Sequence, residues 1–164
     1  MQEQTRTLAP FYEGWDNYQR LLAQVLTPLT LEQLDLKAAP HLRSIGVIAR
    51  HIIGARARWL YYVLREERED LLELGKWDDK DQPARSGEEL AQGLRDTWQV
   101  LHDGLRRWTI ADMEDILRDS DEEAGLEETF TRQWVIWHLI EHDLHHGGEI
   151  SFALGMHGLP AIDL

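Results

Sequence analysis

Apolar residues recur at helical spacing in four long stretches of the chain. In the first stretch, residues 11–26, they return every three to four positions, which is the period of a helix with one buried face. Pro28 follows and ends this helix. The same pattern predicts three further long helices over about residues 45–67, 87–108 and 131–155.

Capping residues mark where several of these helices begin. Ser44 stands directly before the second long stretch and is a favoured residue at that position. The segment SGEE, Ser86 to Glu89, has the capping-box pattern, in which the serine and the glutamate each bind the other's backbone N–H group. The segment TLEQ, residues 30–33, has a similar pattern and predicts a short helix.

The segments between the long helices are acidic and rich in turn residues. LGKWDDKDQPARSG, residues 74–87, is interpreted as a loop, and SDEEAGLEETF, residues 120–130, as a second one. TIADMEDIL, residues 109–117, is interpreted as a short helix, and residues 126–130 as an extended segment. Four amphipathic helices with few strand signals predict an all-α fold: a single four-helix-bundle domain over residues 1–164 with long acidic connections.

Composition limits the partners and the metal ligands that we expect for this chain. The net charge is −13, and such a surface repels phosphate backbones, so we expect no nucleic-acid partner. The N-terminal segment has no signal-peptide pattern and no apolar run reaches membrane-spanning length, so we expect a cytoplasmic protein without a membrane partner. The sequence contains no cysteine. Any metal must therefore be held by His, Asp or Glu, and a thiol needed for chemistry must come from outside the chain.

Histidines are concentrated in the segment WHLIEHDLHHGGEIS, residues 137–151. On a helical wheel with His138 at zero, His142 falls near ~40°, His145 near ~−20°, His146 near ~80° and Glu149 near ~20°. The apolar residues Trp134, Val135, Phe152 and Ala153 share this sector, so we expect all of these side chains to face the bundle interior.

Two of these histidines are placed to chelate a metal ion. His142 and His146 are separated by one helical turn and can bind the same ion. His51 lies on an apolar face of the second long helix and is the best candidate for a third ligand. Three histidine ligands leave a coordination position open, which is typical of a catalytic rather than a structural site. His138, His145 and Glu149 are candidates for catalytic or ligand-orienting residues.

Other residues suggest how a substrate could reach the metal. Gly147 and Gly148 weaken a helix interior, and we expect them to make room for a neighbouring helix or for substrate. Arg58 lies two turns beyond His51 on nearly the same face and could bind a carboxylate. Trp59 and Tyr62 could line the same cavity.

The segments SIGVIARHIIGARARWL and HLIEHDLHHGGEI together resemble the DinB/YfiT-like superfamily. The resemblance extends over nearly the whole chain. It implies a four-helix bundle, often a homodimer, with one divalent metal ion, usually Zn or Ni. It places the ligands on His51, His142 and His146, in agreement with the wheel. Many members read H-H-R-G-Q where this chain has a glycine at 147 and an acid at 149, so an anion-binding role of the usual arginine has no counterpart at Gly147.

Three functions remain open. Relatives in this superfamily include maleylpyruvate isomerase and thiol-dependent S-transferases, which suggests a transferase that uses a small external thiol. The second function is hydrolysis by a metal-bound water; one version treats HLIEH, His138 to His142, as a zinc motif with Glu141 as the base. The third is a non-enzymatic metal-binding stress-response protein.

Overall fold

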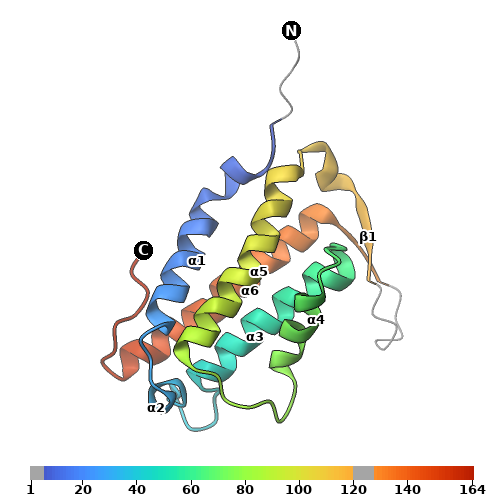
Figure 1. Cartoon of the computed structure of the whole chain (residues 1–164). Helices are drawn as coiled ribbons and strands as arrows, with labels where there is room; N and C mark the ends of the chain where they lie inside the picture. The colour runs from blue at the N-terminus through green and yellow to red at the C-terminus, as the bar shows by residue number, and fades with distance from the viewer. Residues whose placement is uncertain (1–5, 120–127) are drawn as a thin grey trace.

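Four long helices lie side by side in the computed structural model of the chain, which describes residues 6–119 and 128–164 (Figure 1). They are α1 (Glu13–Leu26), α3 (Ile45–Arg58), α5 (Gly87–Arg107) and α6 (Arg132–Met156). Their positions agree with the four apolar stretches of the sequence. The expected all-α four-helix bundle is therefore confirmed.

Short elements precede the first long helix and connect the others. They are η1 (Ala9–Tyr12), α2 (Leu31–Leu34), α4 (Glu69–Gly75), η3 (Lys76–Asp78), η4 (Ala111–Glu114) and the antiparallel strands β1 (Ile116–Arg118) and β2 (Thr129–Thr131). The interpretation of residues 74–87 as a loop was wrong for residues 74–78. Residues 74 and 75 are the end of α4, and Lys76–Asp78 form η3. The extended segment expected at residues 126–130 is β2 from Thr129 onward, and residues 126 and 127 lie outside the described part.

Side-chain caps begin the helices where the sequence predicts. The Ser44 hydroxyl accepts a hydrogen bond from the backbone N–H of Val47 at the start of α3. Both halves of the capping box are present at Ser86, before α5, and at Thr30, before α2. Thr131 caps α6 through the N–H of Trp134. Each cap satisfies N–H groups that the first helical turn leaves without an intrahelical acceptor.

The second long helix ends earlier than the predicted residue 67. After Arg58 the backbone continues as a π-helix, η2 (Trp59–Val63), in which the N–H of Leu64 bonds to the carbonyl of Trp59. Arg65 then takes a positive φ of 59°, which a right-handed helix does not allow. The apolar residues run on from the end of α3 to Leu64, so periodicity alone does not show the change to a π-helix.

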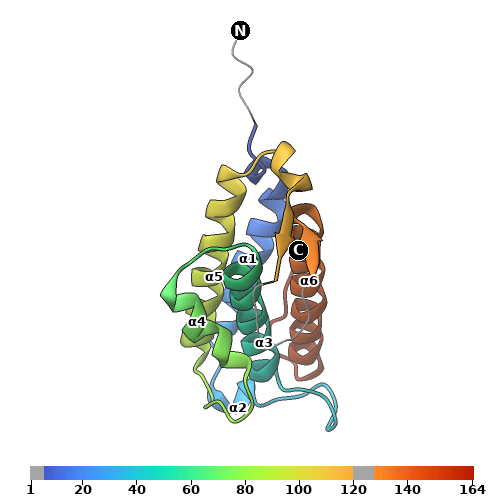
Figure 2. The same cartoon turned by 90° about the vertical axis from the view of Figure 1, so that its right-hand side faces the viewer.

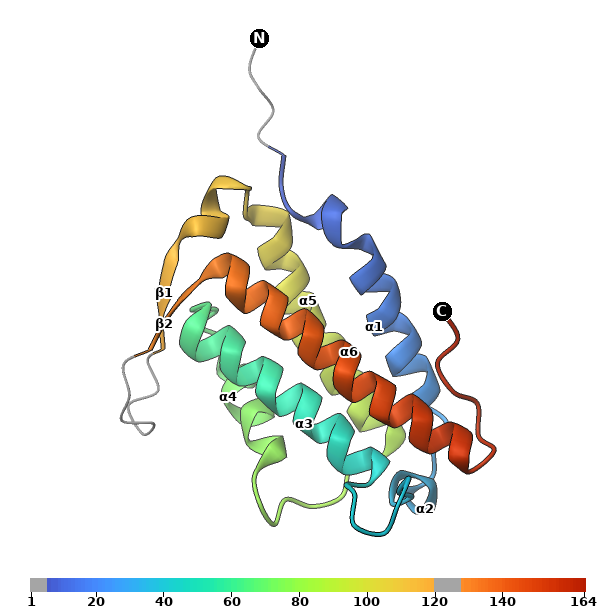
Figure 3. The ribbon, with the colours of Figure 1, turned by 180° about the vertical axis from the view of Figure 1, so that it is seen from behind.

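α3 is the central helix of the bundle. It contacts α5 and α6 and also the α4–η3 segment, while α1 packs mainly on α5. Figure 2 shows α4 covering one side of α3, and Figure 3, seen from behind, shows α6 running alongside α3. Within the described residues, no helix combines the length and apolar character needed to cross a membrane.

A buried ion pair joins the long helices across the core. Arg56 on α3 and Asp143 on α6 have side-chain exposures of 0% and lie 2.8 Å apart. The same Asp143 oxygen accepts hydrogen bonds from Trp15 (2.9 Å) and Gln19 (2.8 Å) of α1. Arg56 also donates to the Thr97 hydroxyl of α5 at 3.2 Å. One polar network thus contacts all four long helices, and its members lose their hydrogen bonds if one helix moves away.

Replacing Asp143 by alanine is expected to destabilise the protein by about 3–5 kcal/mol, because it leaves the Arg56 charge buried without a counter-ion. The measurement is urea unfolding followed by circular dichroism. Arg95→Ala is the matched control: it removes a surface ion pair with Glu88, which contributes about 1 kcal/mol or less. Equal losses for the two variants would show that the buried network does not stabilise the bundle.

Candidate metal centre

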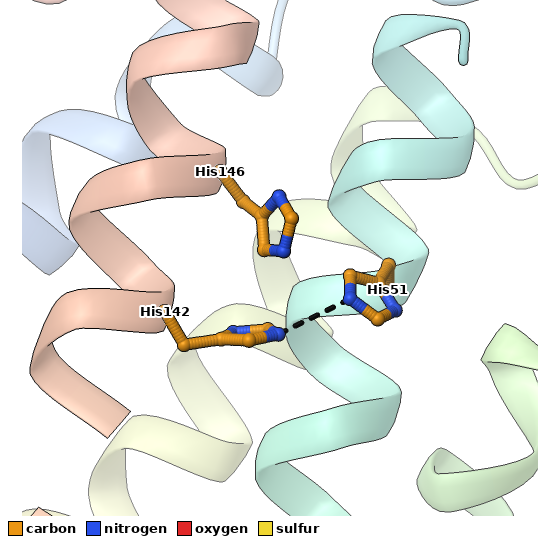
Figure 4. Close-up of side chains that lie close together, drawn as sticks. All are labelled: His51, His142 and His146. Carbon is orange, nitrogen blue, oxygen red and sulfur yellow. Dashed lines mark hydrogen bonds between the residues drawn. The ribbon is translucent and has the colours of Figure 1, made fainter. Parts of the chain in front are cut away.

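Three imidazoles from two helices converge on one point. His142 and His146 project from α6 and His51 from α3, and Figure 4 shows the three rings facing one another. Their nearest ligand atoms all lie within 4.8 Å of one another. His146 is buried, and the other two are partly buried. Two of the rings thus come from one turn of α6 and the third from the middle of α3, as the spacing of His142 and His146 suggested.

The distances between the ring nitrogens suit a metal ion. Nε2 of His142 lies 3.2 Å from Nε2 of His51. Two nitrogens bound to one tetrahedral zinc at ~2.0–2.1 Å from the ion are about 3.3 Å apart. Three neutral imidazoles are also a donor set that zinc and nickel accept. The residues therefore fit a divalent metal, and they can hold one in common.

Burial disfavours the charged form of the two histidines on α6. Desolvation, together with smaller electrostatic contributions from the neighbouring His146 and His51, lowers the pKa of His142 to about 3. Burial also lowers the pKa of His146, although its hydrogen bond to Glu149 opposes the shift. Nδ1 of His142 is buried and has no hydrogen-bond partner in the described part of the chain. Neutral imidazole is the form that binds a metal.

A carboxylate contacts the far side of His51. Nδ1 of His51 lies 3.0 Å from Asp78 of η3. The Arg58 guanidinium contacts the same carboxylate oxygen at 2.7 Å and donates to the carbonyl of Gly75 at 2.7 Å. Burial would raise the pKa of Asp78, but the hydrogen bonds from His51 and Arg58 outweigh it and lower the pKa to about 2.

A second carboxylate contacts His146. Glu149 lies 2.6 Å from Nδ1 of His146. Arg43, in the connection between α2 and α3, donates to Glu149 at 3.1 Å. The two side chains are 40% and 38% exposed, in the order Arg43 and Glu149. The acid at position 149 therefore touches a candidate metal ligand, and a guanidinium reaches it from a segment distant in sequence.

His138 and His145 lie outside the three-histidine cluster. The His138 ring stacks on Trp134 and contacts Glu141 at 3.2 Å. The His145 side chain is 69% exposed, and its Nε2 lies 3.9 Å from Glu149. HLIEH therefore does not bring both of its histidines to one point: the ring centroids of His138 and His142 are 6.1 Å apart, and Glu141 is exposed.

The expected interior sector of α6 was partly wrong. Val135 and Ala153 are buried as expected, but Trp134 is 43% exposed and Phe152 63% exposed. α6 carries apolar residues on all sides, so the wheel does not reveal which side faces the core. The side that faces the core is centred nearer Asp143, and the histidines lie along its edge.

The paired glycines have different surroundings. A Cβ atom at Gly147 would lie 2.1 Å from the hydroxyl oxygen of Tyr18. Gly147 therefore makes room for the Tyr18 side chain of α1, so a neighbouring helix uses the space, as one of the two expectations predicts. A Cβ at Gly148 would meet nothing within 4 Å, so crowding does not explain this second glycine.

A cavity lies along α3 beyond His51. It has a volume of about 200 Å³ and is lined by Ala55, Arg58, Trp59, Tyr62, Val63 and Asp119. Trp59 also contacts Phe130 and His138, with ring centroids 5.2 and 4.9 Å apart. The lining begins one helical turn after His51 and combines apolar surface with the charged residues Arg58 and Asp119.

Two residues at this centre are not predicted by the sequence pattern. Asp78 is one of several acids in the segment at 74–87, and composition gives no reason to select it. Arg43 directly precedes the helix cap Ser44, and no pattern in the sequence distinguishes it from an ordinary exposed arginine. Both reach the histidines only through folding of the connections.

Comparisons with known proteins identify a family and a fold. The sequence model of the DinB superfamily matches residues 15–150. A DinB-like protein from Bacillus cereus has a crystal structure similar to this one, with a TM-score of 0.74 and 22% identity over 98% of this chain and 99% of that one. A conserved protein from Enterococcus faecalis is similar with a TM-score of 0.59 and 14% identity over 92% and 99%. No curated protein matches significantly.

Acid is expected to destabilise the metal-free protein partly through His142. Its pKa of about 3 in the folded chain is below the ~6.5 of an unfolded histidine. Between these values the unfolded state binds more protons, so this contribution to stability is present above about pH 6.5 and is lost as the pH falls. In urea unfolding at pH 7, 6 and 5, the free energy of unfolding should fall less steeply with falling pH for His142→Gln than for the parent. The difference between the two slopes should correspond to at most one proton. Parallel pH profiles would contradict this expectation.

Proposed function

We propose that this chain, which belongs to the DinB superfamily, is a divalent-metal-dependent enzyme whose metal is held by His51, His142 and His146. The observation that carries the proposal is the convergence of three imidazoles from two helices on one point. Zinc and nickel are the metals that we favour, because imidazole ligands suit both. Three protein ligands leave a position for a reactant.

We propose S-transfer from a small external thiol as the reaction: the thiol loses its proton, its sulfur forms a bond to an electrophilic carbon of the substrate, and the group it displaces leaves with the bonding electrons and takes up a proton. A bound divalent metal would supply an activated nucleophile, because it lowers the pKa of a coordinated thiol or water. The chain has no cysteine, so the thiol comes from a cosubstrate. Small thiols are kept reduced in the cytoplasm, which is where we place the activity.

The chain's own residues would position the reactants. Trp59 and Tyr62 offer aromatic walls for an apolar part of the substrate, and Arg58 adds the aliphatic part of its side chain. The Arg58 guanidinium already contacts Asp78 and Gly75, so we assign it packing rather than carboxylate binding. Glu149 orients His146. The His138 ring lies between Trp59 and His142, with ring centroids 4.9 and 6.1 Å away.

The first test is metal content per chain, measured on protein purified without chelators or an affinity tag. We expect about one divalent metal per chain, and a loss of affinity greater than about 100-fold in His51→Ala or His142→Ala. That loss exceeds the ~10–100-fold typical of removing a hydrogen-bond partner of a ligand. His41→Ala changes an exposed histidine and should retain the metal. Metal binding that survives both ligand variants would contradict the proposal.

Turnover then separates the candidate functions. Parent protein with metal should transform an electrophilic substrate only when a low-molecular-weight thiol is present, and His51→Ala should be inactive. Trp59→Ala should mainly raise KM, because it removes a cavity wall. Turnover with metal but without thiol would identify a hydrolase. Metal binding without turnover of either kind would favour a metal-binding stress-response protein.

We also propose that the chain forms a homodimer through the outer side of α6. Four large apolar side chains there are exposed: Trp137, Leu144, Phe152 and Met156. They fall within about 120° of one another around the helix. Gly148 lies within the same sector and leaves open space. Glu141 and His145 are also exposed in this sector, but large apolar side chains predominate. A chain of net charge −13 repels its own copies, and this largely apolar strip is a side on which two copies can approach.

Sedimentation velocity should therefore detect a dimer in the parent protein and a monomer in Trp137→Glu. The substitution places a charge in the apolar strip, where a second copy would bury it. Phe11→Glu is the control, because Phe11 is 62% exposed and lies on η1, away from α6. A monomeric parent, or equal dissociation of both variants, would rule out this interface.

A further inference from the structure

We propose that Asp78 is a positioning residue of the metal centre, which holds the His51 ring in the tautomer whose Nε2 is free to bind a metal. The inference deepens the proposed function, because it concerns a ligand of the same site. It extends the site to the α4–η3 segment, which contributes no metal ligand itself.

The tautomer follows from the two sides of the His51 ring. Nδ1 lies 3.0 Å from Oδ2 of Asp78, and Nε2 lies 3.2 Å from Nε2 of His142. An ionised carboxylate only accepts hydrogen bonds, so the proton between the two groups belongs to Nδ1. A neutral imidazole carries one proton, which leaves the lone pair on Nε2, on the side of the cluster.

Asp78 is itself held in place from two directions. Arg58 donates to its Oδ2 at 2.7 Å and to the carbonyl of Gly75 at 2.7 Å, which ties α3 to the end of α4. A Cβ atom at Gly54 would lie 2.6 Å from Cβ of Asp78. Gly54 thus permits η3 to approach α3 closely enough for the carboxylate to reach His51.

The environment of Asp78 differs from that of the other carboxylate. Glu149 follows His146 by three residues on the same helix, and its side chain is 38% exposed. Asp78 comes from a separate segment and is 19% exposed. A hydrogen bond shielded from water and fixed by a second helix restrains a ring more strongly than an exposed one within a helical turn. We therefore expect the larger positioning effect at His51.

The direct test is the tautomer of His51 in metal-free protein labelled with ¹⁵N-histidine, read from long-range ¹H–¹⁵N spectra. The parent should show His51 protonated at Nδ1. Asp78→Ala should shift His51 toward the tautomer protonated at Nε2, and Asp79→Ala, which changes the exposed neighbour, should not. An unchanged His51 tautomer in Asp78→Ala would overturn the proposal, whether or not the protein proves to be a metal enzyme.

Zinc affinity, measured by competition with a chelator, gives a second readout. Asp78→Ala should lower affinity by about 10–100-fold, the usual effect of losing the partner of a ligand histidine. Asp78→Asn should lower it less, because the amide oxygen can still accept from Nδ1. Equal affinity in the parent and both variants, with unfolding midpoints unchanged, would also overturn the positioning role. If the parent itself binds no zinc, the proposed function fails while the tautomer spectra still decide this inference.

Discussion

The ion pair between Arg56 and Asp143 fixes how α3 and α6 lie against each other. Both side chains are fully buried, and removing two charges from water is costly unless they are paired and hydrogen bonded. Gln19 contacts both members of the pair, and Trp15 contacts the aspartate. Because the hydrogen bonds have strict geometry, sliding one helix along the other would break them.

This constraint sets the position of the histidine cluster. Asp143 directly follows the candidate ligand His142, and Arg56 lies five residues after His51. The ion pair therefore fixes the position of α3 along α6 at a point that lies within about one helical turn of the candidate ligands. Apolar packing alone tolerates many similar arrangements. A buried ion pair can favour one of them, and here the favoured arrangement brings the imidazoles together.

Charge is distributed around the cluster in layers. Burial lowers the pKa of His142 and His146 at its centre, whereas Asp78 and Glu149 lie behind two of the rings. Each carboxylate is contacted in turn by an arginine, Arg58 or Arg43. The charges thus compensate one another at the periphery, and the lone pairs at the centre remain available.

The sequence could predict the parts of this architecture that depend on local chemistry. Caps at Ser44 and Ser86 place two helix starts, because a cap acts within one turn. The spacing of His142 and His146 likewise predicts a shared ion. The orientation of α6 could not be predicted, since apolar residues surround it.

Asp78 also could not be predicted. Its role depends on how the α4–η3 segment packs against Gly54. That contact joins residues far apart in the chain, and no local pattern marks it.

The central claim is that His51, His142 and His146 hold one metal ion together. The most direct measurement is anomalous diffraction at the zinc absorption edge, from crystals of the full chain grown with zinc. The account predicts one strong peak within about 2.0–2.1 Å of Nε2 of all three histidines. A peak at the exposed edge formed by His145 and Glu149, with none between the three rings, would contradict it.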